Sequence, residues 1–310
     1  MNGISDPKIK SALKGYLKVL NKKLRHVHDR DLTLSDLEEI FKTSRGIRRA
    51  SKKEIYKNMS SELSLTFLSI SCCIFLTISI YKKEDEPNTL LPADWLDPKG
   101  LPNPNMVIAD LLTQIVLFSI SIIELVEKGL DNPARALTRT VIETTWQTLI
   151  LLSSREDLKE YVKPDSFDET KEMWFKLFGK GRLQNKLAKI ENSLNFDTES
   201  HKLLKAEREK AHQFFSESVH SGFVSSAVSS ISWEFQSDNG TWSLLGGASR
   251  ASLATIDCLN TNLFYFIRVF FAIITKLHRI TPSKSDKYHW KEAFILQECI
   301  TNISTAEESL

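Results

Sequence analysis

The sequence has few of the residues that mark disulfide-stabilised, zinc-binding or secreted proteins. Only four cysteines occur in 310 residues, and none has the Cys-x-x-Cys or Cys/His spacing of a zinc site. Cys72 and Cys73 are adjacent within an apolar run, which is typical of small buried side chains in a reducing compartment. The opening segment MNGISDPKIKSALKGY contains no apolar stretch of the kind found in a secretory signal. We therefore expect no metal, no cofactor and a cytoplasmic location.

Motifs of the common enzyme classes are also missing. The sequence contains no nucleophile elbow, dinucleotide fingerprint or protein-kinase motif set. The segment GKGR at residues 179–182 follows no predicted strand and lacks the frame of a phosphate-binding loop. A standard metabolic enzyme is therefore disfavoured, and the sequence leaves open whether the protein is an enzyme at all.

Charge is concentrated at the N-terminus. Residues 1–60 contain fifteen Lys and Arg against seven Asp and Glu, so they carry +8 while the whole chain carries +2. A basic region of this kind favours RNA, an anionic membrane or an acidic protein partner, although a solvated helical leader would look the same. The candidate nucleic-acid-binding residues are Arg45, Arg48, Arg49, Lys52 and Lys53.

Long segments with helical periodicity predict an all-α fold, a bundle of five or more long helices. Five core helices are expected to begin near Ser60, Met106, Asn132, Thr198 and Ser249. Gly129 is expected to end the second, and Asn132 with Pro133 to open the third. Alternating apolar residues on either side of Asn239–Gly240 predict a small β-hairpin insertion near residues 231–245.

The same pattern predicts three regions along the chain. Residues 1–59 form a basic helical region, residues 60–280 the core domain, and residues 281–310 a C-terminal helix and tail. Within the first region, Thr33 or Ser35 is the expected N-cap of a helix, and Glu38 three residues after Ser35 suggests a capping box. Five prolines between residues 82 and 105 predict a long loop, which Trp95 would fix to the body.

One apolar run is long enough to raise the question of a membrane. Leu63–Tyr81 is nineteen residues without a charge, which just reaches the length of a span. Six of these residues are Ser or Thr, and the later apolar segments contain Glu124 and Arg268. We therefore expect a buried helix of a soluble bundle, with an inner-membrane anchor as the alternative. Because they contain these charges, the two later apolar segments are not expected to be spans.

A line of charged residues marks the middle of the chain. Arg135, Arg139 and Glu143 follow one another at four-residue steps among residues that otherwise look buried. Charges on a buried helix face are costly unless they are paired, so Arg139 and Glu143 are expected to form an ion pair. Such a pair either fixes the register of the helix or belongs to a functional site.

A second polar line accompanies it on a later helix. His212, Ser216 and His220 also follow at four-residue steps and share one face. If Glu143 and His220 converge, the carboxylate could orient the imidazole for general acid–base chemistry. The candidate catalytic residues are therefore Arg139, Glu143 and His220, with Ser216 and His212 as further candidates. His220 could equally be a hydrogen-bonded histidine of the core.

The segments NPARALTRTVIETTWQTLILL and EREKAHQFFSESVHSGF together resemble a set of all-helical bacterial proteins of unknown function. Arg139, Glu143, Ser216 and His220 occupy the positions of their shared Arg-x-x-x-Glu and Ser-x-x-x-His patterns. These proteins are similar to abortive-infection helical proteins and, more distantly, to HEPN ribonucleases. The HEPN pattern needs four to six residues between Arg and His, whereas Arg208 and His212 have three between them.

Three hypotheses follow. The first, implied by the resemblance and the basic region, is a cytoplasmic effector of a phage-defence or stress system that acts on RNA or nucleotide. The second is a non-enzymatic regulatory bundle whose charged cluster is structural and whose basic region docks a protein partner or a second copy. The third is a membrane-anchored effector held by Leu63–Tyr81.

Overall fold

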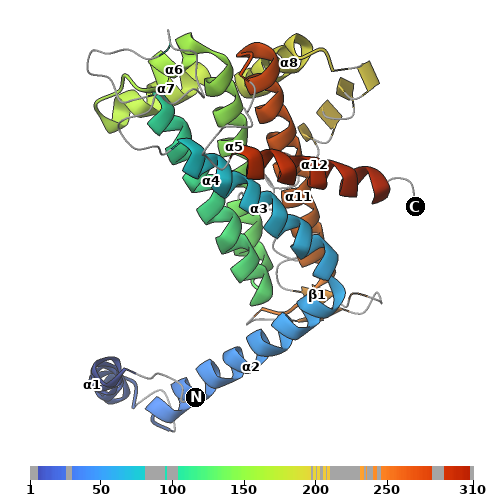
Figure 1. Ribbon diagram of the computed structural model, residues 1–310. Coiled ribbons are helices and arrows are strands. Elements are labelled where there is room, and N and C mark those ends of the chain that lie inside the picture. The colour runs from blue at the N-terminus through green and yellow to red at the C-terminus, as the bar shows by residue number, and fades with distance from the viewer. Residues whose placement is uncertain are drawn as a thin grey trace.

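The computed structural model describes residues 6–25, 30–80, 95, 104–196, 231–233, 235, 240–242, 246–280 and 290–307, with eight more between 198 and 209. These residues form an all-helical bundle from which a helical arm projects (Figure 1). The expected fold class is therefore confirmed at the level of a helical bundle.

Four long helices make the centre of the bundle. They are α3 (Ser60–Ile80), α4 (Pro104–Glu127), α5 (Asp131–Ser153) and α11 (Arg250–Ala272). Helix α4 packs most extensively on α5, while α11 contacts both α5 and α3. Helix α11 continues directly into a π-helical turn, η2 (Ile273–Leu277). The core consists largely of the Leu, Ile, Val and Phe side chains on the facing sides of these helices.

Shorter helices cover the ends and one side. Helices α6 (Arg155–Tyr161), α7 (Phe167–Leu177) and α8 (Arg182–Ser193) follow α5 and gather at one end of the bundle, and α12 (Trp290–Glu307) crosses α3 (Figure 1). The turn between α7 and α8 contains Gly179 and Gly181, and Gly181 has a left-handed conformation. Trp95 packs edge-on against His278 at 5.2 Å between ring centroids, so it contacts the body as expected.

Uncharged polar side chains link the central helices to one another. Thr66 of α3 donates to Asn260 Oδ1 of α11 at 2.7 Å, and Asn260 Nδ2 donates to the Glu62 carbonyl at 2.9 Å. Asn262 of α11 donates to the Thr145 hydroxyl of α5 at 3.1 Å. Because a polar group inside an apolar core is costly unless it is bonded, these contacts favour one alignment of the helices.

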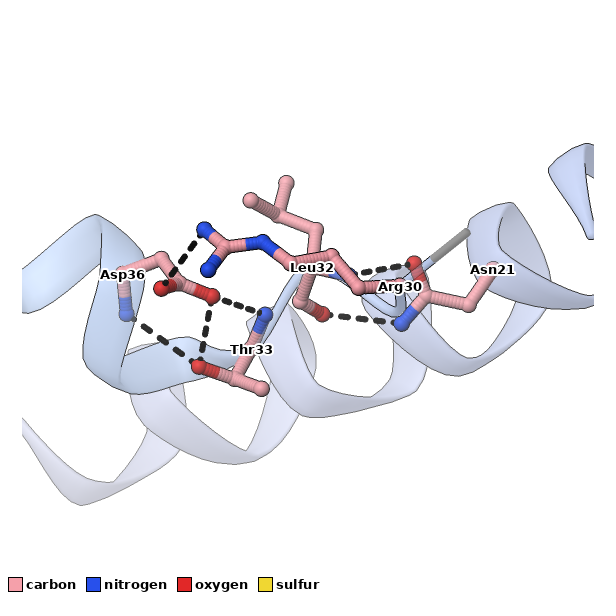
Figure 2. Close-up of polar contacts among 5 residues, drawn as sticks. All are labelled: Asn21, Arg30, Leu32, Thr33 and Asp36. Carbon is pink, nitrogen blue, oxygen red and sulfur yellow. Dashed lines mark hydrogen bonds and ion pairs between the residues drawn. The ribbon is translucent and has the colours of Figure 1, made fainter. Parts of the chain in front are cut away.

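Two helices form the projecting arm, α1 (Pro7–Leu24) and α2 (Leu34–Asn58) (Figure 1). Thr33 is the N-cap of α2, and its capping-box partner is Asp36, not Glu38 as expected from Ser35. Glu38 instead forms an ion pair with Lys10, whose Nζ lies 2.8 Å from Glu38 Oε1. The capping geometry lowers the pKa of Asp36, chiefly through the hydrogen bond from the Thr33 backbone (Figure 2).

The hairpin expected near residues 231–245 is described in part. Ile231–Trp233 (β1) and Gly240–Trp242 (β2) pair antiparallel, with Ile231 opposite Trp242. Residues 236–239 and 243–245 lie outside the described part of the chain. The insertion as a whole therefore stays a prediction.

The junction between α4 and α5 is a tight turn that also touches a distant segment. Gly129 has φ +69°, and the Leu130 and Gly129 amides donate to the Leu125 and Val126 carbonyls, which is the Schellman ending expected at this glycine. Gly247 donates its amide to the Gly129 carbonyl at 2.9 Å. A Cβ on Gly129 would lie 2.5 Å from the Gly247 nitrogen, so no side chain fits there.

The start of α5 differs from the expected one. The helix begins at Asp131, and its N-cap residue Leu130 makes no side-chain cap bond, so Asn132 is not the cap. Pro133 is still tolerated because the first-turn amides of a helix have no partner within the helix. The side chain of Asp131 is engaged elsewhere, as described below.

Three helices, not one, are long and apolar enough to cross a membrane. They are Ser60–Ile80, Asn105–Glu127 and Arg250–Leu277. The expectation that the two later segments would not qualify was wrong, because single charges such as Glu124 do not outweigh the apolar residues around them. Half of each of the first two windows is buried inside the bundle, and two thirds of the third.

We predict that Gly129→Ala destabilises the protein more than Gly181→Ala. Both glycines have positive φ, which costs an alanine about 1–2 kcal/mol. Only Gly129 also meets backbone atoms within 4 Å of the added Cβ, whereas Gly181 meets none. The free energy of unfolding of the two variants, from urea denaturation, checks this, and equal losses would contradict the close approach of Gly129 and Gly247.

Candidate functional site

The central pair of the predicted charged line is present on α5. Arg139 Nε lies 2.9 Å from Glu143 Oε1, and the two side chains are 23% and 27% exposed. The four-residue spacing brings the two side chains together on one face of the helix. The predicted pairing is therefore confirmed, but the pair lies at the edge of the core and not within it.

The Arg139 guanidinium is only partly hydrogen-bonded among the described residues. Its Nε donates to Glu143, whereas its Nη1 is buried and has no hydrogen-bond acceptor within the described chain. Trp146, about two turns further along the same face, has a buried indole Nε1 that likewise lacks an acceptor among the described residues. Two buried donors on this face of α5 thus have no acceptor among the described residues, beside the Glu143 carboxylate that already accepts from Arg139.

The remaining arginine of the line has a different role. Arg135 Nε lies 2.7 Å from Asp131 Oδ2, and the side chains are only 6% and 10% exposed. Asp131 also accepts a hydrogen bond from the Thr255 hydroxyl of α11 at 2.7 Å. Burial raises the pKa of the Asp131 carboxyl, while the Arg135 charge opposes that shift. Arg135 and Asp131 thus form the buried ion pair of the line, and they fix α5 against α11.

Sequence reasoning missed Asp131 although the signal was available. The spacing from Asp131 to Arg135 is the same four residues that indicated the Arg139–Glu143 pair. Asp131 also lies in the segment LDNPAR, in which the sequence pattern indicated Asn132 as the helix cap and gave Asp131 no role. A carboxylate at the start of a helix can serve either role, and the tertiary partner Thr255 decides between them.

A second buried charged cluster joins α8 to α11. Glu191 is fully buried, and its Oε1 accepts hydrogen bonds from Arg208 and, at 2.6 Å, from the Tyr265 hydroxyl. His201 Nδ1 lies 3.4 Å from the other carboxylate oxygen. Sequence reasoning missed this cluster, although Glu191 lies between Leu187 and Leu194 on the apolar face of its helix, which is a core position. Arg208 therefore pairs with a carboxylate of the core.

The histidine line lies outside the described residues. His212, Ser216 and His220 all fall between residues 210 and 230, for which no placement is given. The expectation that Arg139, Glu143 and His220 converge thus remains a prediction, with only the first two brought together. Among the described residues, no group of three or more His, Cys, Asp or Glu side chains could hold a metal ion.

The predicted nucleic-acid-binding residues all lie on α2. Arg48, Arg49 and Lys53 are exposed there. Lys52 forms an ion pair with Glu127 of α4 at 2.7 Å, and Tyr56 donates its hydroxyl to the same carboxylate. The Glu127 hydrogen bond raises the pKa of Lys52. Lys52 therefore helps to dock the arm on the bundle, which leaves the other cations of α2 as the candidates for a ligand.

Comparison with known proteins adds one finding. Residues 105–234, less than half of the chain, match a family of unknown function, DUF5677. The matched segment begins with α4 and contains Arg139, Glu143 and His220. No curated protein and no solved structure matches the chain. The chain is thus similar over its middle part to an uncharacterised family, and this match supplies no activity.

We predict that Asp131→Asn destabilises the protein far more than Glu143→Gln. The first change neutralises a buried carboxylate that contacts both Arg135 and Thr255, at a cost of about 3–5 kcal/mol. The second affects a pair that is about a quarter exposed, so solvent screening limits the loss to about 1 kcal/mol. Urea denaturation of both variants measures the two losses, and a larger loss for Glu143→Gln would contradict the assignment.

Proposed function

We propose that the protein is a helical effector that binds RNA or a nucleotide through Arg139 on α5. The observation that supports this is the half-engaged guanidinium, held at Nε by Glu143 while its buried Nη1 has no acceptor among the described residues. An arginine held in one orientation presents donors that match the oxygens of a phosphate. Glu143 then acts as a positioning residue that keeps the guanidinium directed at the ligand.

A catalytic role in addition to binding is proposed from the sequence pattern alone. His220, with Ser216 or His212 beside it on the same predicted face, would supply general acid–base catalysis if the ligand is cleaved. The exposed cations of α2, including Arg48, Arg49 and Lys53, would add electrostatic attraction for a polyanion. A cytoplasmic role in phage defence or a stress response is supported by the sequence resemblance.

We predict that Arg139→Gln weakens binding of a labelled RNA oligonucleotide or of ATP by about tenfold or more, because a hydrogen bond from a charged group is lost. The protein should stay folded, since the pair is partly exposed. Arg182→Gln on α8 is the matched control, because Arg182 bonds only the Phe175 carbonyl near the surface among its described contacts. Fluorescence anisotropy measures both, and equal binding by wild type and Arg139→Gln would refute the proposal.

A regulatory bundle without enzyme activity is the second candidate. It is favoured by the two buried clusters, in which Arg135 and Arg208 are each paired with a core carboxylate and serve the packing of α11. In that case Arg139 and Glu143 also serve structure, and Glu143→Gln would lower the melting temperature without changing any ligand affinity. The basic arm would then bind a protein partner or a second copy.

A membrane-anchored effector is the third candidate, and it is favoured by the composition of α3, α4 and α11. If α3 is a span, the protein stays in the membrane pellet after a carbonate wash, and Ile74→Asp in α3 releases it. If the bundle is soluble, as we propose, the wild-type protein is recovered in the supernatant. Cell fractionation of the full-length chain therefore separates the two.

A further inference from the structure

Helix α1 is amphipathic, but it contacts α2 along one edge of its apolar face. Lys10 pairs with Glu38, and the Asn21 side chain both donates to and accepts from the backbone of Leu32, at 2.8 and 3.1 Å (Figure 2). Leu17 is the one apolar side chain of α1 that is buried within the described chain. Residues 10, 17 and 21 are seven and four residues apart, which places them on one side of α1, the side that is held.

The centre of the apolar face is open to solvent. Ile9, Tyr16 and Leu20 are 53%, 73% and 42% exposed, and Val19 beside them is 56% exposed. Their spacing places them together on one side of the helix, rotated away from the side that contacts α2. Several large apolar side chains gathered on one exposed helix face mark an interaction surface.

The rest of the α1 surface is rich in lysine. Helix α1 contains Lys8, Lys10, Lys14, Lys18, Lys22 and Lys23 and no Asp or Glu. Lys8 and Lys23 flank the apolar face on one side and Lys10 on the other, while the remaining lysines lie on the opposite, polar face. That combination is typical of helices that lie in the headgroup region of an anionic bilayer, with the apolar side chains inserted and the lysines at the phosphates.

The alternative occupants fit less well. A second α1 would bring six lysines against six, with no carboxylate on that helix to neutralise them. RNA would attract the lysines, but its phosphates would leave Ile9 and Leu20 in water. Only a surface that is both apolar and anionic uses the two features together.

We propose that α1 is an interfacial helix that docks the protein on anionic lipid surfaces. Ile9, Tyr16 and Leu20 insert between the acyl chains, and the lysines bind the lipid phosphates. The arm places this helix away from the body of the bundle (Figure 1), so docking needs no rearrangement of the core. The inference requires neither a ligand at Arg139 nor a membrane span.

The test is flotation of the full-length protein with vesicles of phosphatidylcholine containing one third phosphatidylglycerol, against vesicles of phosphatidylcholine alone. Wild type should bind the anionic vesicles, and should bind less as salt rises. The triple variant Ile9→Ser, Tyr16→Ser and Leu20→Ser should bind roughly 100-fold more weakly, because its inserted apolar surface is lost.

If the triple variant does not fold, vesicle binding by single-substitution variants tests the proposal. Tyr16→Ser should weaken vesicle binding several-fold, whereas Phe167→Ser, which removes an 83% exposed aromatic residue from α7, should leave it unchanged. The proposal is overturned if wild type does not bind, if it binds both vesicle types equally, or if the variants bind like wild type. It is also overturned if the triple substitution only converts a dimer into a monomer, as judged by analytical ultracentrifugation.

Discussion

The buried ion pair of Asp131 and Arg135, with the hydrogen bond that Thr255 donates to Asp131, is the contact on which the placement of α5 depends. Helix α5 lies between α4 and α11, and most of its side chains are buried. Apolar packing is non-directional and would tolerate several rotations of such a helix. Asp131 restricts that freedom, because its two oxygens reach Arg135 on its own helix and Thr255 on α11. The orientation of α5 in turn sets where Arg139 faces.

A helix buried in a protein core and a helix that crosses a membrane have similar apolar compositions. Hydropathy alone therefore does not distinguish the two. The buried sides of α3 and α4 are mainly apolar, with a few buried Ser, Thr and Asn side chains among them. The outer side of α4 carries the exposed polar residues Asp110, Gln114 and Glu124, and the exposed apolar residues Leu117 and Ile120 lie between the last two. A lipid-facing surface would disfavour those charges. These helices therefore meet a hydropathy criterion for spans while half of each apolar window is buried inside the bundle.

The sequence was sufficient for features that depend on local chemistry. Gly129 ends α4 and Ser249 caps α11 because a positive φ and a side-chain acceptor are requirements of a single helix end. The Arg139–Glu143 pair was predictable for the same reason, since both residues lie on one helix.

Features that depend on a distant partner were not predictable in this way. Asp131 could have been a cap, a salt-bridge partner or a ligand, and only the position of Thr255 selects among them. Glu191 needed Arg208 and Tyr265, which approach from other segments of the chain. Loss of Arg208 would remove the guanidinium that pairs with the buried Glu191 carboxylate, so such a position is retained only when the whole arrangement forms together.

Charge divides the protein into two parts with different surfaces, and this division argues for two separate roles. The arm carries an excess of lysine and arginine beside exposed apolar side chains on α1, whereas the remainder of the chain is net negative. Arg139 lies on the bundle, where its side chain is 23% exposed, so it offers a single contact and not an extended basic surface. A polyanionic or lipid surface would meet the arm first, because long-range attraction depends on net charge. The arm would then determine where the protein resides, and α5 would determine what it binds there.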